Sequence, residues 1–224
     1  MNDDALFLFS DVLEYDNKTC FKLFYKKEEY DIISPMLGIF NVYNLVCSIA
    51  IIVSLGIDLE DVLKYICRIS IPKGRMNVIN YGQNFTVILD YAHTTYATSE
   101  VLKFVNKVKR GNIITVVGCA GGRYKEKRKE IGKIVSEESD IAIFTMDDPR
   151  YEKIEDIFKD MLEDVETDNV LTIKNRKKAI KKAFALASDN DIVLILGKGK
   201  DNYMAIKNKH KKYNDYNVIK KILR

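Results

Sequence analysis

From residue 76 onward, short runs rich in β-branched residues alternate with segments of helical periodicity. This alternation constrains the fold more than any other feature, because strands separated by helices build βαβ units and a mainly parallel sheet. We therefore predict a doubly wound α/β fold for this part of the chain. The expected strands are MNVINY (76–81), FTVILDY (85–91), 112–118, 140–146, 169–173 and 191–196, and the expected helices are about 95–109, 125–137, 154–164, 176–187 and 215–223.

The preceding residues have a different pattern. Three short strands are expected in FLFSDVLEY, TCFKLFYKK and EYDII, followed by helices at roughly 40–55 and 59–68. Asp58 is a plausible N-cap of the second helix. The segment SIPKGR (70–75) then combines a proline and a glycine, which is typical of a linker. The sequence therefore predicts two parts, residues 1–73 and 74–224.

Composition excludes several classes of protein. The chain of 224 residues has a formal charge of +4, which favours anionic ligands without requiring nucleic acid. Its four cysteines, at 20, 47, 67 and 119, have no metal-ligand spacing, so we expect reduced thiols and no bound metal. The start, MNDDALFLF, lacks the basic residues of a signal peptide, and the apolar stretch 45–57 is too short to span a bilayer. We expect a cytoplasmic protein, a monomer without membrane or nucleic-acid partners.

Four polar loops follow the predicted strands: DYAHTT (90–95), GCAGGRYKEKR (118–128), MDDPRYE (146–152) and GKGKDNY (197–203). Ligands of such sheets bind beyond the carboxyl ends of the strands, so we expect these loops to form one site. In the first loop, an aspartate or threonine can cap the next helix; alternatively, Asp90 accepts hydrogen bonds from ribose hydroxyls or from metal-bound water, with His93 against a base. None of the loops has the Walker A spacing.

Two of these loops indicate an anionic or zwitterionic ligand. The glycines of residues 118–128 allow the backbone to approach an anion, and Arg123 and Arg128 can bind a carboxylate or phosphate in bidentate fashion. Most lysines of that loop are expected on a solvated helix face. In MDDPRYE, aspartates and Arg150 together suit a ligand that carries both an ammonium and a carboxylate.

The loops in this order resemble the Mur ligase family, and within it the tripeptide synthetases, which add a diamino acid to UDP-MurNAc-L-Ala-D-Glu with ATP and Mg²⁺. The resemblance extends through the tail KKYNDYNVIKKIL. It implies that residues 74–224 are the Rossmann-like C-terminal domain that delivers the amino acid, and that residues 1–73 end the central ATP-binding domain. The P-loop, the magnesium ligands and a carbamylated lysine are expected upstream of Met1. The matching segments are GIFNVYN (38–44), GRM (74–76), DYAHT (90–94), GCAGGRYKEKR (118–128), DDPR (147–150) and GKGKDNY (197–203).

The resemblance also implies roles for individual residues. The nucleotide would be bound by Asn41, Asn44, Arg75, Asp90 and His93. The amino-acid pocket would consist of Arg128, Asp148, Pro149, Arg150, Gly197, Lys198 and Asp201. No catalytic residue is implied within this chain, which alone is expected to be inactive.

This chain departs from the family pattern at several positions. Tyr124 stands where members often have aspartate, Asp148 where they often have asparagine, and Lys200-Asp201 where they often have His-Glu. Arg150 favours a substrate with a distal carboxylate, because lysine would leave its guanidinium unpaired. We therefore favour meso-diaminopimelate over L-lysine.

Other functions stay open at this point. A related amide ligase, of the cyanophycin or folylpolyglutamate type, has the same domain, although the DDPR and GKGKDNY loops argue against it. A truncated paralogue that only binds or regulates is an alternative of a different class. A chain that pairs with a separately encoded ATPase half is a third.

Overall fold

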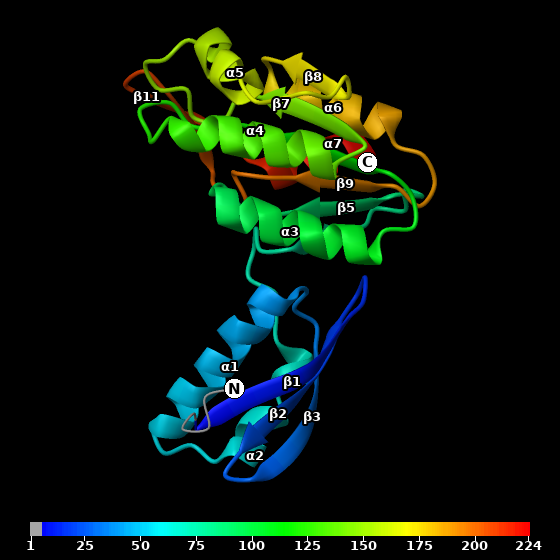
Figure 1. Cartoon of the computed structure of the whole chain (residues 1–224), viewed down its shortest axis with the longest axis vertical. Helices are drawn as coiled ribbons and strands as arrows, with labels where there is room; N and C mark the ends of the chain where they lie inside the picture. The colour runs from blue at the N-terminus through cyan, green and yellow to red at the C-terminus, as the bar shows by residue number, and fades with distance from the viewer. Residues whose placement is uncertain (1–5) are drawn as a thin grey trace. The chain divides into compact units, whose positions relative to one another are not determined.

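The computed structural model describes residues 6–224, so most of the acidic start of the chain lies outside it. The chain forms two compact units, the first ending at Ile71 and the second spanning Pro72–Arg224 (Figure 1). This boundary lies two residues before the one predicted from the SIPKGR segment. No helix in the described part of the chain is long and apolar enough to cross a membrane.

The first unit is an antiparallel sheet packed against helices. Its strands pair in the order β1 (Phe7–Glu14), β2 (Thr19–Tyr25), β3 (Glu28–Ser34). Inward-facing residues of β2 and β3 pack against α1 (Ile39–Ser54), which supplies the other side of the core. The three strands and α1 were predicted from the sequence with nearly these bounds.

The predicted helix at 59–68 is wrong in its second half. The helix α2 covers only Leu59–Leu63, and a separate 3₁₀ turn, η1, covers Ile66–Arg68. Asp58 caps α2 as expected, since its side chain accepts a hydrogen bond from the backbone of Glu60. The chain changes direction after α2 and brings Ile66 into the core of this unit, where it is buried.

The second unit contains a six-stranded sheet in the order β4-β5-β9-β6-β7-β8. Only β4 runs antiparallel to its neighbour β5, and the other pairs are parallel. This confirms the predicted mainly parallel α/β fold. The strands are β4 (Asn77–Ile79), β5 (Thr86–Leu89), β6 (Ile113–Val117), β7 (Ile141–Thr145), β8 (Val170–Ile173) and β9 (Ile192–Ile195).

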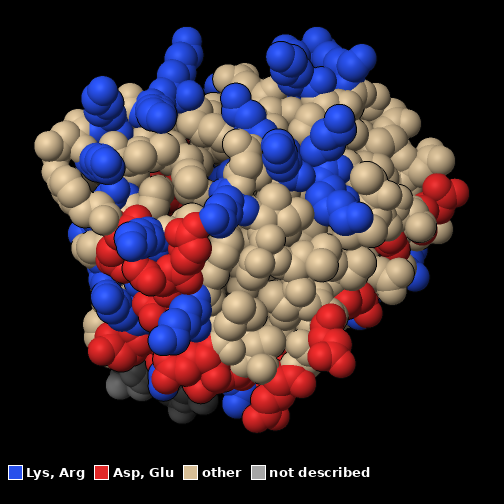
Figure 2. All heavy atoms as spheres, turned by 90° about the horizontal axis from the view of Figure 1, so that it is seen from above, with Lys and Arg blue, Asp and Glu red and all other residues tan. Residues whose placement is uncertain are grey.

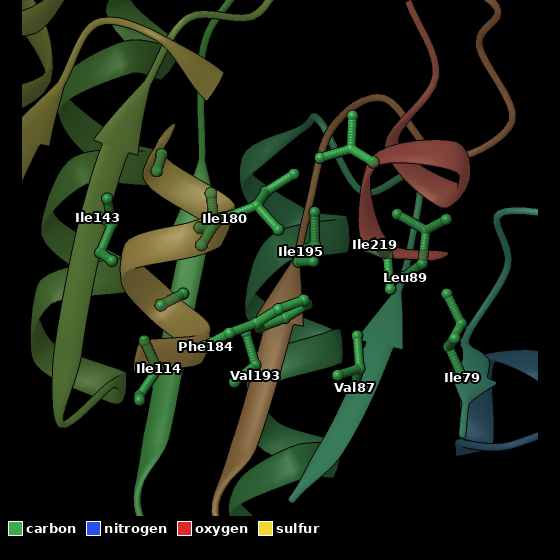
Figure 3. Packing of buried hydrophobic residues seen from close by; sticks show 14 of the residues in the cluster. Ile79, Val87, Leu89, Ile114, Ile143, Ile180, Phe184, Val193, Ile195 and Ile219 are labelled. Atoms are coloured by element: carbon green, nitrogen blue, oxygen red, sulfur yellow. The ribbon is translucent and has the colours of Figure 1, made fainter. Parts of the chain in front are cut away.

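Helices cover both faces of this sheet (Figure 1). The helices α3 (Thr95–Val108), α4 (Glu126–Glu138) and α5 (Ile154–Leu162) pack side by side on one face. On the other face, α6 (Arg176–Leu186) and α7 (Asp215–Leu223) pack together. Figure 3 shows Ile180 and Phe184 of α6 directed at the sheet, where they meet Val193 and other branched residues of the strands. The core between α6, α7 and the sheet thereby fixes the strand ends that carry the functional loops.

The sequence analysis missed one element, a hairpin formed by β10 (Tyr203–Ile206) and β11 (Lys209–Lys212). β11 has no apolar residue and is exposed along its whole length, so no alternating pattern marks it. Its partner β10 buries Met204 and Ala205, which attach the hairpin to the unit.

Candidate functional site

A cavity of about 260 Å³ lies at the carboxyl ends of the parallel strands of the second unit. Each of the four loops predicted to form a site contributes to its wall, which confirms their convergence. The lining residues are Tyr91, His93 and Thr94 after β5, Gly118, Cys119, Ala120, Arg123 and Lys127 after β6, Asp147, Asp148 and Arg150 after β7, and Gly197 and Asp201 after β9.

Glycines allow the loops to come this close together. A Cβ atom on Gly118 would lie 2.3 Å from the carbonyl oxygen of Thr145, and one on Gly121 would lie 2.1 Å from that of Pro149. Both distances are far inside van der Waals contact, so neither position accepts a side chain. The Gly121 N–H donates to the Asp148 carbonyl at 2.8 Å, which ties the loops after β6 and β7 together.

Three aspartates surround one buried lysine at the base of the cavity. The ammonium of Lys198 donates to the carboxylate of Asp148 at 2.8 Å and also contacts Asp147 at 3.3 Å and Asp201 at 3.2 Å. Asp148 additionally accepts a hydrogen bond from the backbone of Ala205 at 2.9 Å. Because the carboxylates outnumber the ammonium, the cluster presents a negative wall that can attract a ligand cation.

The pKa values of this cluster reflect burial and mutual charge. Burial raises the pKa of Asp147, and the neighbouring Lys198 ammonium acts in the opposite direction. Burial alone would lower the pKa of Lys198, but the charges of Asp147, Asp148 and Asp201 outweigh it and raise that pKa. Lys198 therefore remains an ammonium at neutral pH.

A ligand in the cavity cannot reach the Lys198 side chain. Its side chain is fully buried and its ammonium is surrounded by the three aspartates, and it does not line the cavity. Lys198 was expected to contact the amino acid; in this structure its ammonium is a counter-ion to the three carboxylates and holds them in position. Pro149 is likewise behind the wall, in backbone contact with Gly121.

Arg150 lies at the cavity with its guanidinium uncommitted. The structure gives this guanidinium no hydrogen bond or ion pair with any residue in 6–224, although the side chain is half-buried. Its backbone is fixed in a left-handed conformation, with φ of 51°. The Arg150 N–H donates to Ala205 at 3.0 Å and its carbonyl accepts from Lys207 at 2.7 Å, so the β10 hairpin determines where this arginine points.

Arg128, which was expected to belong to the amino-acid pocket, does not line the cavity. It is fully buried and its guanidinium donates to Glu152 at 2.8 Å, to Asp160 at 2.7 Å and to the carbonyl of Ala120 at 3.0 Å. These partners occupy both terminal nitrogens. The Arg128 side chain lowers the pKa of Glu152 to about 2, so the pair is ionised at neutral pH. The Glu152 carboxylate also accepts a hydrogen bond from the Gly122 N–H, so this network holds the glycine loop in place from the side away from the cavity.

Asp90 accepts two backbone hydrogen bonds, a structural role that was not part of its expected contacts with a nucleotide. Its two carboxylate oxygens accept from the backbone N–H groups of Met76 and Ala92, each at 2.7 Å. Burial raises the pKa of Asp90, and these two hydrogen bonds act against that shift. The predicted helix cap after this loop is Thr94, whose hydroxyl accepts from the Ala97 N–H at 3.2 Å.

The other residues expected to bind a nucleotide are found in two places. In the second unit, the Arg75 guanidinium lies 5.2 Å from the centre of the Tyr91 ring, and the exposed His93 ring contacts the same ring. In the first unit, Asn41 is buried and donates to the Leu37 carbonyl at 2.7 Å, and Asn44 donates to Asn41 at 3.3 Å. Neither asparagine caps α1, which has no side-chain cap.

Several residues of the cavity wall were not among the predicted site residues. Lys127 was assigned to a solvated helix face, but it lines the cavity and donates to the His93 carbonyl at 3.0 Å. Tyr91 and Cys119 also line it, and burial raises the pKa of the Cys119 thiol to about 12. Their positions directly after strands β5 and β6 were the only sequence signal.

Comparison with known proteins places the second unit in a family. Residues 74–199 match the model of the Mur ligase, glutamate ligase domain. A Clostridium acetobutylicum protein named UDP-N-acetylmuramoyl-L-alanyl-D-glutamate--2,6-diaminopimelate ligase 1 is 38% identical over 189 residues, 84% of this chain and 39% of that protein. A UDP-N-acetylmuramyl-tripeptide synthetase from Borreliella burgdorferi is 37% identical over 96% of this chain and 44% of its own length. The chain thus spans about two fifths of the length of these relatives.

Solved structures agree with the sequence comparison. A structure described as a UDP-N-acetylmuramoyl-L-alanyl-D-glutamate--2,6-diaminopimelate ligase has a TM-score of 0.69 and 29% identity, and it covers all of this chain and 46% of that chain. A folylpolyglutamate synthase from Mycobacterium tuberculosis has a TM-score of 0.72 at 20% identity, which shows a shared fold. Because this match spans all six strands of the sheet and reaches all four site loops, the last of them as far as Gly199, this chain belongs to the Mur ligase family.

Proposed function

We propose that this chain is the amino-acid-delivering part of an ATP-dependent ligase that adds meso-diaminopimelate to UDP-MurNAc-L-Ala-D-Glu in peptidoglycan precursor synthesis. One observation carries the proposal: an unpaired arginine and a negative wall share one small cavity. Arg150 offers a guanidinium for a carboxylate, and Asp148 and Asp201 offer carboxylates for an ammonium. A site of this kind is complementary to the end of an amino acid, which carries one carboxylate and one ammonium.

The distal end of diaminopimelate carries one carboxylate and one ammonium. In the proposed complex, Arg150 binds that carboxylate and the aspartates around Lys198 bind that ammonium. The second amino group then points out of the cavity, free to attack. L-lysine has no distal carboxylate and would leave Arg150 without a partner at a half-buried position, which costs binding free energy. The names of the relatives, diaminopimelate ligases, support the same substrate.

The proposed reaction has two steps. ATP with Mg²⁺ supplies the phosphoryl group that activates the glutamate carboxylate of the acceptor as an acyl phosphate. The amino group held by this chain then attacks the acyl carbon and releases phosphate. The contribution of the second unit is to bind and orient the amine, which converts an encounter of two substrates into a step within one complex.

The first unit is proposed to end the ATP-binding domain, with Asn41 and Asn44 directed at the adenine. In the second unit, Arg75 and His93 are proposed to contact a nucleotide. Asp90 would act through the Met76 backbone that it holds rather than by direct contact. The cytoplasmic location and the monomeric state remain predictions. This chain has no Walker A sequence, so we expect it to release no phosphate from ATP by itself.

Calorimetric titration of the chain with meso-diaminopimelate, L-lysine and L-ornithine tests the proposal. We expect diaminopimelate to bind most tightly. Arg150→Ala should weaken its binding by about 10- to 100-fold, the loss of a charge-assisted contact of about 1.5–3 kcal/mol. Arg68→Ala, at an exposed arginine of the first unit, is the matched control and should bind as the parent does.

The competing substrate gives the opposite pattern. L-lysine that binds as tightly as diaminopimelate, with affinity unchanged in Arg150→Ala, would refute the assignment of the distal carboxylate. Diaminopimelate binding that survives Arg150→Ala but is lost in Arg123→Ala would assign the carboxylate to the other arginine of the cavity wall.

A further inference from the structure

The charges of this chain are unevenly distributed along the sequence. Residues 174–224 contain 15 lysines and arginines and 4 aspartates, a formal charge of +11. The whole chain carries +4, so residues 1–173 carry −7. In Figure 2, basic side chains predominate over the upper part of the face shown, whereas acidic side chains lie at its lower left, where they intermingle with basic ones, and along its right and lower right edge. Such an asymmetry indicates an anionic partner for the basic side.

The basic residues converge on a groove between α6 and α7, which we name the α6–α7 groove. Its volume is about 730 Å³, larger than the cavity at the sheet edge, and the two share no residue. Three separate elements place lysines along it, and none of its residues is acidic. The lining residues are Lys177, Lys178 and Lys181 of α6, Lys212 of β11, Lys221 of α7, and Asn202, Tyr213, Asn214, Asn217, Val218 and Ile222.

The five lysines of the groove are exposed and have no ion pair with any residue in 6–224. On the other face of the sheet, by contrast, lysines form ion pairs with neighbouring carboxylates. Lys103 pairs with Glu100 at 2.9 Å, and Lys129 pairs with Glu163 at 3.6 Å. Lys177 and Lys178 even occupy the first turn of α6, where a helix is stabilised by acidic residues rather than basic ones. The stability of the fold therefore does not account for these charges.

The floor of the groove is apolar. Tyr213 and Val218 are 8% and 9% exposed, and Ile222 is half-buried beside them. The Tyr213 hydroxyl donates to Asp215 at 2.7 Å, so the groove has no free hydroxyl there. A ligand that fills the groove must therefore carry apolar groups as well as several negative charges.

We propose that the α6–α7 groove binds an acidic segment of a partner protein, one that carries apolar side chains between its carboxylates. The apolar floor would receive the apolar side chains, and the lysines of the rim would pair with the carboxylates, as in helix-in-groove recognition. Nucleic acid fits less well, because the only aromatic residue of the groove is buried and cannot stack on a base, and no arginine lines it. A membrane fits less well too, because the apolar residues form a floor and do not protrude.

Fluorescence anisotropy with a labelled synthetic peptide tests this proposal. The peptide has leucines at helical spacing (i, i+3, i+7) and glutamates at most other positions; a matched peptide has serines in place of the leucines. The groove variant is Lys177→Glu/Lys181→Glu. The control variant is Lys182→Glu/Lys209→Glu, which changes the net charge equally at exposed lysines outside the groove. Urea unfolding of each variant verifies that it is folded.

We expect the leucine peptide to bind the parent chain, the groove variant to lose at least about tenfold in affinity, and the control variant to lose less than about twofold. The serine peptide should bind about tenfold more weakly than the leucine peptide. Equal losses in both variants would reduce the effect to general charge attraction and overturn the proposal. Equal affinity of the two peptides, absence of binding, or tighter groove-dependent binding of an RNA oligonucleotide or of phosphatidylglycerol vesicles would overturn it as well.

Discussion

Replacing Asp215 by alanine should destabilise the second unit more than any other single exchange of a polar residue discussed above. Asp215 is fully buried, and its carboxylate accepts from Arg176 through Nε at 2.9 Å and through Nη2 at 2.7 Å. The same Nη2 donates to the carbonyl of Leu196 at 2.7 Å. Asp215 therefore connects the starts of α6 and α7 to the end of β9, next to the site loop at Gly197.

The magnitude follows from what Arg176 would lose. Burial alone would lower the pKa of Arg176, and Asp215 is the main group that raises it. Because an arginine stays protonated in proteins, the variant would leave a buried guanidinium without its carboxylate partner. It would keep only the Leu196 carbonyl, because its Nη1 has no partner among the described residues. Removing one partner of a buried ion pair costs about 3–5 kcal/mol. With a urea m-value of about 2 kcal/mol/M, the midpoint should fall by about 2 M.

Urea unfolding followed by circular dichroism measures this shift, and hydrogen exchange of the β9 amides reports the second unit alone. Tyr213→Phe is the matched control, since it removes one hydrogen bond to the same carboxylate at 2.7 Å and should cost only about 1 kcal/mol. A midpoint shift below about 0.5 M for Asp215→Ala would refute the reasoning, because it would mean that the guanidinium finds water or another partner.

Three further predictions concern the site. Gly121→Ala should cost about 1–3 kcal/mol and weaken diaminopimelate binding in the same titration, because its Cβ would lie 2.1 Å from the Pro149 oxygen; parent-like binding would contradict it. Arg128 holds the pKa of Glu152 at about 2, below its ordinary 4.5, so this stabilisation is complete above pH 4.5 and is lost as pH falls towards 2. Urea midpoints measured across that range should fall less steeply in Glu152→Gln. The Cys119 thiol, buried and with a pKa of about 12, should resist alkylation by iodoacetamide at pH 8 until the unit unfolds, and mass spectrometry of the labelled peptides would detect an earlier reaction.

The sequence predicted the sheet and its loops because both depend on local patterns. Branched residues mark the buried strands, and side-chain caps mark helix starts, as with Asp58 before α2 and Thr94 before α3. The convergence of four loops followed from topology, since parallel strands present their carboxyl ends at one edge.

The errors concern residues whose environment is set by distant parts of the chain. Arg128 was expected to bind a ligand, but Glu152 and Asp160, 24 and 32 residues later, accept hydrogen bonds from its terminal nitrogens. Lys198 is similarly enclosed by carboxylates from another loop. No local pattern distinguishes a basic residue with such partners from one without them. The hairpin at β10 and β11 was missed because one of its strands has no buried face.

The backbone of residues 74–76 is fastened beside the cavity. The Met76 N–H donates to Asp90 at 2.7 Å, and Gly74 packs so closely on the loop at Gly199 that a Cβ there would lie 2.4 Å from the Lys200 nitrogen. Residues 74–76 thus lie at the sheet edge that carries the cavity, held there by the loops after β5 and β9. The start of the second unit is therefore part of the frame of the cavity, so a change in the backbone at Gly74 or Met76 would be transmitted to the cavity wall through Asp90 and Gly199.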